Sequence, residues 1–412
     1  MSAIDLIDRI RPHVRRERLL DTATRLIAAP SPTGEAGPAC DCMADILQSD
    51  GFVVQREAGG HPAAPAVLAR LDSGRPGKCL EFDGHLDVVH LPFVPPSVEG
   101  NLLKGSGSCD MKGGTAAAVE ALRAIRDSGL LERGNVLLCA HDLHEAPWGL
   151  GQQLDALIRR GLHGNAVMIP EALCQHLPVI GRGSATWKVH LRRAGAPVHE
   201  VMRPADEPNV ISAGADLVRR LDDLNARLAI GSDSPAGKPT AFVGQIHAGE
   251  IYNQYPQECM VEGTRRWLPG TDMRAVETEF RTLLTGVEAD HRVGIHLDWR
   301  PIRDGFHLDL ADPFVAVFQS CHSAMSGAPL PTGPKLFVDD GNSFSALAKI
   351  PAVTHGPRGG GQHTVHEWVD IDDLVRVAVL YALTALVYLN ESEFIGRVGK
   401  PVLQGTATSC TN

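Results

Sequence analysis

Two short segments of this 412-residue chain, GHLDVV at Gly84–Val89 and GSCDMKGG at Gly107–Gly114, most restrict how it can fold. The first continues the apolar run KCLEF, which predicts a buried strand, and it offers His85 and, two residues later, Asp87. The second offers Asp110, followed by two glycines and the helical run TAAAVEALRAI. One metal-capable side chain therefore ends a strand, and another stands at the start of a helix.

Two later segments also place acidic residues after buried strands. NVLLCAHDLHE (135–145) carries Glu145 at its polar end, and NAVMIPEAL (165–173) reaches Glu171. Apolar spacing predicts helices in RERLLDTATRLIAA and PACDCMADILQSDG, and β-branched content predicts strands in FVVQRE and PAVLARLD. Alternating strands and helices indicate an α/β sheet, in which ligands bind outside the carboxyl ends of the strands. His85, Glu145 and Glu171 all fall at such ends.

The pattern changes at about Gly183. Four segments alternate apolar and polar residues as half-buried strands do: SATWKVHLRRAG, TAFVGQIHAG, QECMVEGTRRW and VGIHLDWRP. Two predicted helices lie among them, VISAGADLVRRLDDLNARL and MRAVETEFRTLLTGV. We predict an inserted α+β domain at 184–299 and a metal-binding catalytic domain at 1–183 and 300–412. A loose tail is expected at the C-terminus.

Composition excludes several classes of function. Hydrophobic residues make up 43% and charged residues 21%, as in a soluble globular protein. The net charge of −10, with acids and bases interspersed, argues against non-specific binding to nucleic acid. No apolar run has the roughly 18 residues of a membrane span, and the N-terminus lacks the apolar stretch of a signal peptide. Nine cysteines without CxxC spacing fit free thiols. We expect a cytoplasmic protein with a small-molecule substrate and no membrane partner.

The segments quoted above, together with GPRGGGQHTVHEW near the C-terminus, resemble the M20-type metallohydrolases over almost the whole chain. This family includes acetylornithine deacetylase, succinyl-diaminopimelate desuccinylase, aminoacylase and glutamate carboxypeptidase. The resemblance implies a mixed-sheet catalytic domain of the metallo-exopeptidase type, with an inserted lid and dimerisation domain. It therefore also implies a homodimer.

The resemblance implies one or two divalent metal ions per subunit. His85 and Glu171 would bind the first ion, Asp110 would bridge both, and His363 would bind the second. The match of QHTVHEW to the family's HTxxE spacing favours His363 over His366 and His355. Imidazole and carboxylate donors suit Zn²⁺, Mn²⁺ or Co²⁺. Asp87 would be the carboxylate that orients His85.

The chain departs from the family at HDLHEAPWG, where the family has a glutamate pair. In one register Glu145 is the metal ligand and His144 occupies the position of the general base. In the other, Glu145 is the base and Ala146 falls at the ligand position. The second register suggests a single-metal site, completed by His141 or His144. We favour the first, because it keeps the ligand set whole.

Other implied residues belong to the lid. His199, in GAPVHE, resembles the histidine that reaches across the dimer to stabilise the oxyanion. Asn253 and Arg266 resemble residues that bind a substrate carbonyl or carboxylate, with Arg265 as the competitor of Arg266. Asn209 also resembles a lid residue, although an asparagine before a helix is usually a cap.

The leading prediction is therefore a metal-dependent hydrolase that cleaves an amide C–N bond in a small carboxylate-bearing molecule such as an N-acyl amino acid. The altered base position, and His90 where the family usually has proline, motivate an alternative: hydrolytic deamination of an activated aromatic amine such as a nitroanthranilate. The third alternative is an inactive metal-binding homologue with a binding role.

Overall fold

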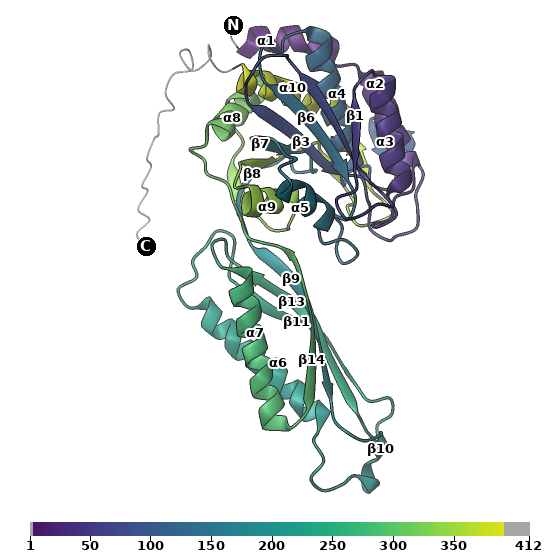
Figure 1. Ribbon diagram of the computed structural model, residues 1–412, viewed down its shortest axis with the longest axis vertical. Helices are drawn as coiled ribbons and strands as arrows, with labels where there is room; N and C mark the ends of the chain where they lie inside the picture. The colour runs from purple at the N-terminus through teal and green to yellow at the C-terminus, as the bar shows by residue number, and fades with distance from the viewer. Residues whose placement is uncertain (1–2, 391–412) are drawn as a thin grey trace.

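In the computed structural model, which describes residues 3–390, two lobes are joined by extended strands (Figure 1). The upper lobe in that view holds residues 3–181 and 306–390, and the lower lobe holds residues 183–303. The C-terminal tail expected from the sequence lies outside the described residues.

A six-stranded mixed sheet of order β1-β2-β6-β3-β7-β17 forms the centre of the upper lobe. Its strands are β1 (Val54–Glu57), β2 (Ala66–Asp72), β3 (Cys79–His85), β6 (Asn135–His141), β7 (Ala166–Ile169) and β17 (Ala352–Thr354). Strands β6, β3, β7 and β17 are parallel, whereas β2 pairs antiparallel with both β1 and β6. The predicted α/β class is confirmed. The four parallel strands direct their carboxyl ends to one edge of the sheet.

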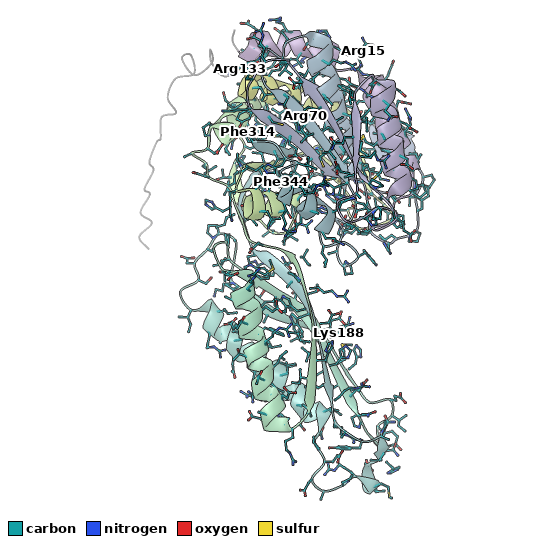
Figure 2. All side chains as sticks on the ribbon, viewed as in Figure 1. Arg15, Arg70, Arg133, Lys188, Phe314 and Phe344 are labelled. Carbon is teal, nitrogen blue, oxygen red and sulfur yellow. The ribbon has the colours of Figure 1, made fainter. Side chains whose placement is uncertain are left out.

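Helices bury both faces of this sheet, and Phe314 and Phe344 are among the buried side chains of this lobe (Figure 2). The helices are α1 (Ala3–Ile10), α2 (Arg16–Ala28), α3 (Gly37–Ser49), α4 (Lys112–Ser128), α5 (Gln152–Arg159), α8 (Pro313–Ser326), α9 (Asp340–Ser343) and α10 (Ile371–Leu389). A short 3-10 helix at Arg11–His13 and a short π-helix at Phe344–Ala348 adjoin them. Leu80, Phe82 and Leu138 face the core that contains α4 and α10, whereas Leu137 packs with Leu157 of α5 on the other side. Strands covered on both faces read as continuous apolar runs. Within residues 3–390, no helix combines the length and apolarity that a membrane crossing requires.

Two small sheets lie beside the central one. The first contains β4 (Ser97–Glu99), β5 (Leu102–Lys104), β18 (Gly359–Gly360) and β19 (Trp368–Asp370), and the second contains β8 (Leu177–Gly181), β15 (Phe306–His307) and β16 (Thr332–Lys335). Strands β8 and β15 come directly before and after the lower lobe in sequence. They therefore lie where the chain leaves and re-enters the upper lobe.

The lower lobe is an antiparallel sheet of order β11-β13-β9-β14 that packs against two helices (Figure 1). The elements are β9 (Gly183–Arg192), α6 (Val210–Ala229), β11 (Thr240–Ala248), β13 (Glu258–Trp267), α7 (Met273–His291) and β14 (Gly294–Arg303). Alternate residues of β9, Trp187, Val189 and Leu191, point into its core. Far from the upper lobe, β10 (Val198–His199) pairs with β12 (Gln254–Tyr255), next to a 3-10 turn at Glu200–Met202.

Two glycines allow α4 to start close to the end of β7. A Cβ atom on Gly114 would lie 1.9 Å from the carbonyl oxygen of Pro170, and one on Gly113 would lie 2.3 Å from the carbonyl oxygen of Ser108. Both distances are far shorter than a van der Waals contact. Only glycine therefore lets the helix after Asp110 approach the strand end that precedes Glu171.

We predict that Gly114→Ala lowers the free energy of unfolding by about 1–3 kcal/mol, because the added methyl group must push α4 away from Pro170. Chemical denaturation of the metal-free protein measures this change. Gly294→Ala is the matched control, since a Cβ there meets only a carbonyl oxygen at 3.8 Å. Equal stability of the two variants would contradict the close-approach argument.

Candidate metal centre

The candidate site lies at the carboxyl edge of the central sheet. His85 is the last residue of β3, Glu145 follows β6, and Glu171 follows β7. Asp110 comes just before α4, and His363 follows β18 from a distant part of the chain. The five residues that the resemblance implied as ligands therefore come from five separate segments, and the fold brings them together.

Asp110 lies between two histidines. One carboxylate oxygen, Oδ1, is 3.2 Å from Nε2 of His85, and the other, Oδ2, is 3.4 Å from Nε2 of His363. The His85 nitrogen is also 3.6 Å from Oε1 of Glu171, and the His363 nitrogen is 3.2 Å from Oε2 of Glu145. The site thus has two sets of nitrogen and oxygen donors, which share Asp110.

The donor chemistry fits divalent metal ions. The ligand atoms of His85, Asp110 and Glu145 lie within 4.8 Å of one another, and so do those of His85, His144 and Glu171. Imidazole and carboxylate donors at such spacing suit Zn²⁺, Mn²⁺ or Co²⁺. His363, unlike His366 and His355, faces these acids, although its side chain is 55% exposed.

The carboxylates of the site repel one another unless positive charge lies between them. Burial and the charge of Asp110 raise the pKa of Glu171 to about 7. Burial acts in the same direction on Asp110, but hydrogen bonds to His363 and His85 hold the pKa of Asp110 well below its usual range. Hydrogen bonds to Asp110 and Glu145 raise the pKa of His363 to about 10. Without metal, protonated histidines therefore supply the positive charge that a bound cation would otherwise supply.

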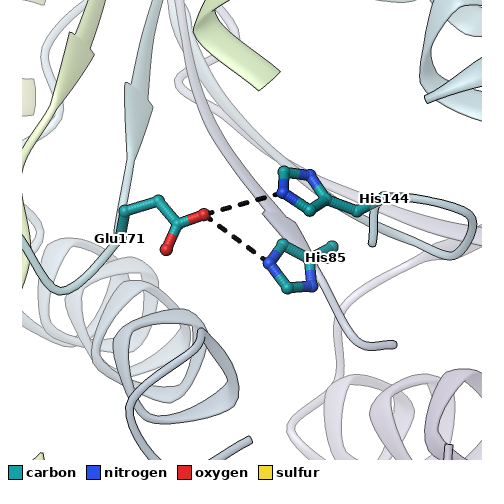
Figure 3. A group of neighbouring side chains, drawn as sticks. All are labelled: His85, His144 and Glu171. Carbon is teal, nitrogen blue, oxygen red and sulfur yellow. Dashed lines mark ion pairs between the residues drawn. The ribbon is translucent and has the colours of Figure 1, made fainter. Parts of the chain in front are cut away.

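His144 also faces the site. Its ring stacks on His85, with the ring centroids 3.9 Å apart and an interplanar angle of 11°. Its Nε2 lies 3.9 Å from Oε1 of Glu171, and Figure 3 shows both imidazoles directed at this one oxygen. On its other side, Nδ1 of His144 bonds Oδ1 of Asp340 at 2.9 Å. No local pattern marks Asp340 as a site residue, because the segment DDGNSF around the start of α9 has the composition of an ordinary helix start.

Two further acids hold the loops that carry the candidate ligands. The carboxylate of Asp87 accepts backbone N–H groups of His144 and Glu145, each at 3.0 Å, whereas His85 Nδ1 bonds the backbone oxygen of Asp87 at 2.9 Å. Asp87 therefore contacts His85 mainly through its main chain, and its side chain fixes the turn after β6. The second acid is Glu367, the glutamate of the HTxxE spacing.

Glu367 fixes the loop before α4. Its buried carboxylate accepts the backbone N–H groups of Gly107, Cys109 and Asp110 at 2.8, 2.7 and 2.6 Å. A carboxylate that accepts several backbone donors is a strong local constraint. This acid therefore holds the loop that positions Asp110 between the two histidines.

Three residues that the resemblance implied for the lid, His199, Asn253 and Asn209, lie in the lower lobe and not beside the candidate ligands. Nε2 of His199 is 3.1 Å from Nδ2 of Asn253, at the β10–β12 end of the lower lobe, which Figure 1 shows at the far end of the molecule from β3. Asn209 caps α6, since its side chain accepts the N–H groups of Ile211 and Ser212. Within one subunit, the fold does not bring these three residues to the candidate ligands.

Arg266 of β13 differs from its neighbour Arg265. Arg265 pairs with Glu279 at 3.0 Å. Arg266 is half-buried, and burial together with the charge of Arg182 lowers its pKa. Within residues 3–390, neither Arg266 nor Arg182 forms an ion pair with a carboxylate. Two partly desolvated guanidinium groups near each other form a candidate anion site.

We predict that metal binding releases protons at neutral pH, because His363 is protonated in the metal-free protein and must be neutral to bind a cation. The apparent affinity for Zn²⁺ should rise about tenfold per pH unit for each proton released, between about pH 6 and pH 8. Calorimetric titrations in buffers of different ionisation enthalpy count the protons, and His363→Ala should release about one fewer. A binding heat that does not depend on the buffer would contradict this prediction.

The comparisons with known proteins agree with this architecture. A sequence model described as peptidase family M20/M25/M40 matches residues 82–386. A protein from Methylobacterium radiotolerans named succinyl-diaminopimelate desuccinylase is 28% identical over 404 residues, covering 92% of this chain and 99% of that protein. An aminopeptidase from Bacillus cereus has a similar fold, with a TM-score of 0.74, 18% identity, and coverage of 91% of this chain and 99% of the other.

A second solved structure, from Bacillus subtilis, is described as a dinuclear metal binding peptidase from the M20 family. Its TM-score is 0.64, with 17% identity and coverage of 90% of this chain and 97% of the other. The family model spans most of the chain, so the resemblance and the fold class inferred from sequence are confirmed. This chain therefore belongs to peptidase family M20/M25/M40 and is a hydrolase that acts on amide C–N bonds.

Proposed function

We propose that this protein is a metal-dependent hydrolase that cleaves the amide bond of a small carboxylate-bearing substrate such as an N-acyl amino acid. The observation that carries the proposal is the position of Asp110, whose two carboxylate oxygens face His85 and His363. The relatives named succinyl-diaminopimelate desuccinylases would, by that name, remove a succinyl group from an amine-bearing dicarboxylic acid. This name supports an acylated amino acid as the substrate class.

In this proposal His85, Asp110 and Glu171 hold one divalent ion, and Asp110, Glu145 and His363 hold a second. Zn²⁺, Mn²⁺ and Co²⁺ all fit these donors. When bound, such ions lower the pKa of a water molecule and polarise the carbonyl that is attacked. These residues would hold the ions with Asp110 shared between the two donor sets; His85, Glu145 and Glu171 are buried, whereas His363 is half-exposed.

Two residues are candidates for the proton transfer that hydrolysis requires. His144 stands where the family has its first glutamate, and Glu145 is the single glutamate of the segment. The backbone N–H groups of both donate to the carboxylate of Asp87, so the turn that carries them is held rigidly. Either side chain could take a proton from water and pass it to the leaving nitrogen.

Arg266, with Arg182 beside it, is the proposed site for the substrate carboxylate. Guanidinium groups bind carboxylates with paired hydrogen bonds, and neither arginine has an acidic partner in the described residues to compete. Arg182 directly precedes β9, and Arg266 lies opposite Ser184 at the start of β9, where the chain enters the lower lobe. This position supports a role for residues 184–299 as a lid that covers the substrate.

His199 and Asn253 would then act from the partner subunit of a homodimer, stabilising the oxyanion and contacting the substrate carbonyl. Their distance from β3 within one chain supports this arrangement, because neither can reach the metal centre of its own subunit (Figure 1). Asn209 remains a candidate with a weaker case, since capping α6 occupies its side-chain oxygen. The comparisons favour neither the aryl-amine deaminase nor the inactive homologue.

Asp110→Ala should abolish both metal loading and turnover, because it removes the one carboxylate that both donor sets share. Elemental analysis of the purified protein and hydrolysis of a panel of N-acyl amino acids measure the two effects. Asp223→Ala, which removes an exposed carboxylate of α6, is the matched control and should keep both. An Asp110 variant that retains metal and activity would overturn the proposed function.

Arg266→Met should raise KM for N-acyl amino acids about 10–100-fold, the equivalent of one charged hydrogen bond of about 1.5–3 kcal/mol. The same variant should change KM little for substrate analogues in which the α-carboxylate is an amide. Arg300→Met, which removes an exposed arginine of β14, controls for the loss of surface charge. Equal loss for both kinds of substrate would show that Arg266 does not read the carboxylate.

A further inference from the structure

Two loops run from the buried metal centre to the surface of the upper lobe. Residues 86–94 follow β3, and residues 142–151 follow β6. Because β3 and β6 are parallel neighbours, both loops leave the same edge of the sheet. His85 and Glu145 are buried, whereas Trp148 is 43% exposed and Phe93 is 44% exposed. Both loops therefore lie between the candidate ligands and solvent.

Backbone hydrogen bonds hold the two loops together near the ligands. The carboxylate of Asp87, on the first loop, accepts the backbone N–H group of Glu145, on the second, at 3.0 Å. The N–H group of Gly149 donates to the carbonyl oxygen of Glu145 at 2.7 Å and closes a single turn that contains Trp148. The tryptophan is therefore carried by the same turn as a candidate metal ligand.

A stack of two rings joins the loops farther out. The imidazole of His90 and the indole of Trp148 have centroids 4.2 Å apart and an interplanar angle of 9°. Nε2 of His90 donates to the carbonyl oxygen of Thr33 at 2.9 Å, so the imidazole is held in place. Leu91 and Phe93, which follow His90 on its loop, are also exposed apolar side chains. A tryptophan supported on one face, beside apolar neighbours, offers a surface to a flat apolar group.

The two loops carry no side chain that would bind a second carboxylate. Residues 86–94 (LDVVHLPFV) and 144–151 (HEAPWGLG) contain neither lysine nor arginine, and their acids, Asp87 and Glu145, repel an anion. Arg303 donates to the carbonyl oxygen of Leu150, but its guanidinium is buried and paired with Asp340. A succinyl group ends in a carboxylate, which is costly to bury without a partner. Charge therefore favours an uncharged acyl group at these loops.

The proposed function leaves the acyl half of the substrate to the upper lobe. Arg266, opposite Ser184 where the chain enters the lower lobe, is the proposed site for the substrate carboxylate. The amide that is cleaved must lie at the metal centre. The acyl group, on the other side of that amide, is then the part that the loops after β3 and β6 can contact.

We propose that Trp148, supported by His90, binds an aromatic acyl group, so that the substrate is an N-aroyl amino acid. The inference rests on the proposed function and narrows its substrate class. An aryl ring stacks in offset geometry on the indole face that His90 leaves free, and this contact adds to the burial of apolar area. A flexible aliphatic chain gains the burial without the stacking.

The test uses the full-length, metal-loaded protein and the amino acid that is hydrolysed fastest as its N-acetyl derivative. Its N-benzoyl, N-hexanoyl and N-succinyl derivatives are compared, and kcat/KM should be highest for the N-benzoyl compound. Trp148→Ala should lower kcat/KM for this substrate about tenfold, mainly through KM, because one aromatic contact is lost. The N-succinyl substrate should change little. Trp148→Phe, which keeps a flat ring, should retain most of the preference.

Val53→Ala is the control variant and should leave all three values unchanged. Val53 is 84% exposed and directly precedes β1, which runs in the same direction as β6, so it lies at the opposite edge of the sheet from the site. Should Trp148→Ala fail to fold, product inhibition of the wild type decides: benzoate should inhibit at a lower concentration than succinate or hexanoate.

A wild type that prefers the N-succinyl or the N-hexanoyl substrate would overturn the inference. Equal losses for all three substrates in Trp148→Ala would also overturn it, because the tryptophan would then not read the acyl group. Failure of the metal-loaded wild type to hydrolyse any N-acyl amino acid would instead overturn the proposed function, and the inference with it.

Discussion

The arrangement of the candidate site depends on three largely buried carboxylates, Asp110, Glu145 and Glu171, which gather around the imidazoles of His85 and His363. Buried charges of one sign are costly unless opposite charge lies between them. In the metal-free protein, His85 and His363 provide that charge, and they do so from either side of Asp110. Divalent cations could provide it more completely, because each brings two positive charges to a point that several oxygens share.

The remainder of the upper lobe holds these acids in place against their mutual repulsion. Parallel strands bring β3, β6 and β7 to one edge, and Gly114 lets α4 start against the end of β7. Glu367 and Asp87 then fix the two loops through backbone hydrogen bonds. Such support matters, because a site held to within a fraction of an ångström binds its ion without first rearranging.

Much of this could be predicted from the sequence, because each candidate ligand follows a local pattern. An apolar strand that ends at His85, or that is followed by Glu145 or Glu171, can be recognised in a sequence window of about ten residues. The α/β class follows from the alternation of strands and helices along the chain. Asp340 and Glu367 could not be found this way, since their partners lie far along the chain and nothing in their own segments signals those contacts. Asn209 shows the converse: its local pattern, asparagine before a helix, describes what it does in the structure.

Some predictions remain predictions, including the division at 184–299, the homodimer and the roles of the site residues. The most direct test of the central claim is a crystal structure of the metal-loaded protein, with anomalous scattering recorded at the absorption edge of the metal. The account predicts two anomalous peaks on opposite sides of the Asp110 carboxylate, one beside His85 and Glu171 and one beside Glu145 and His363. Metal that binds elsewhere, with Asp110 contacting no ion, would contradict it.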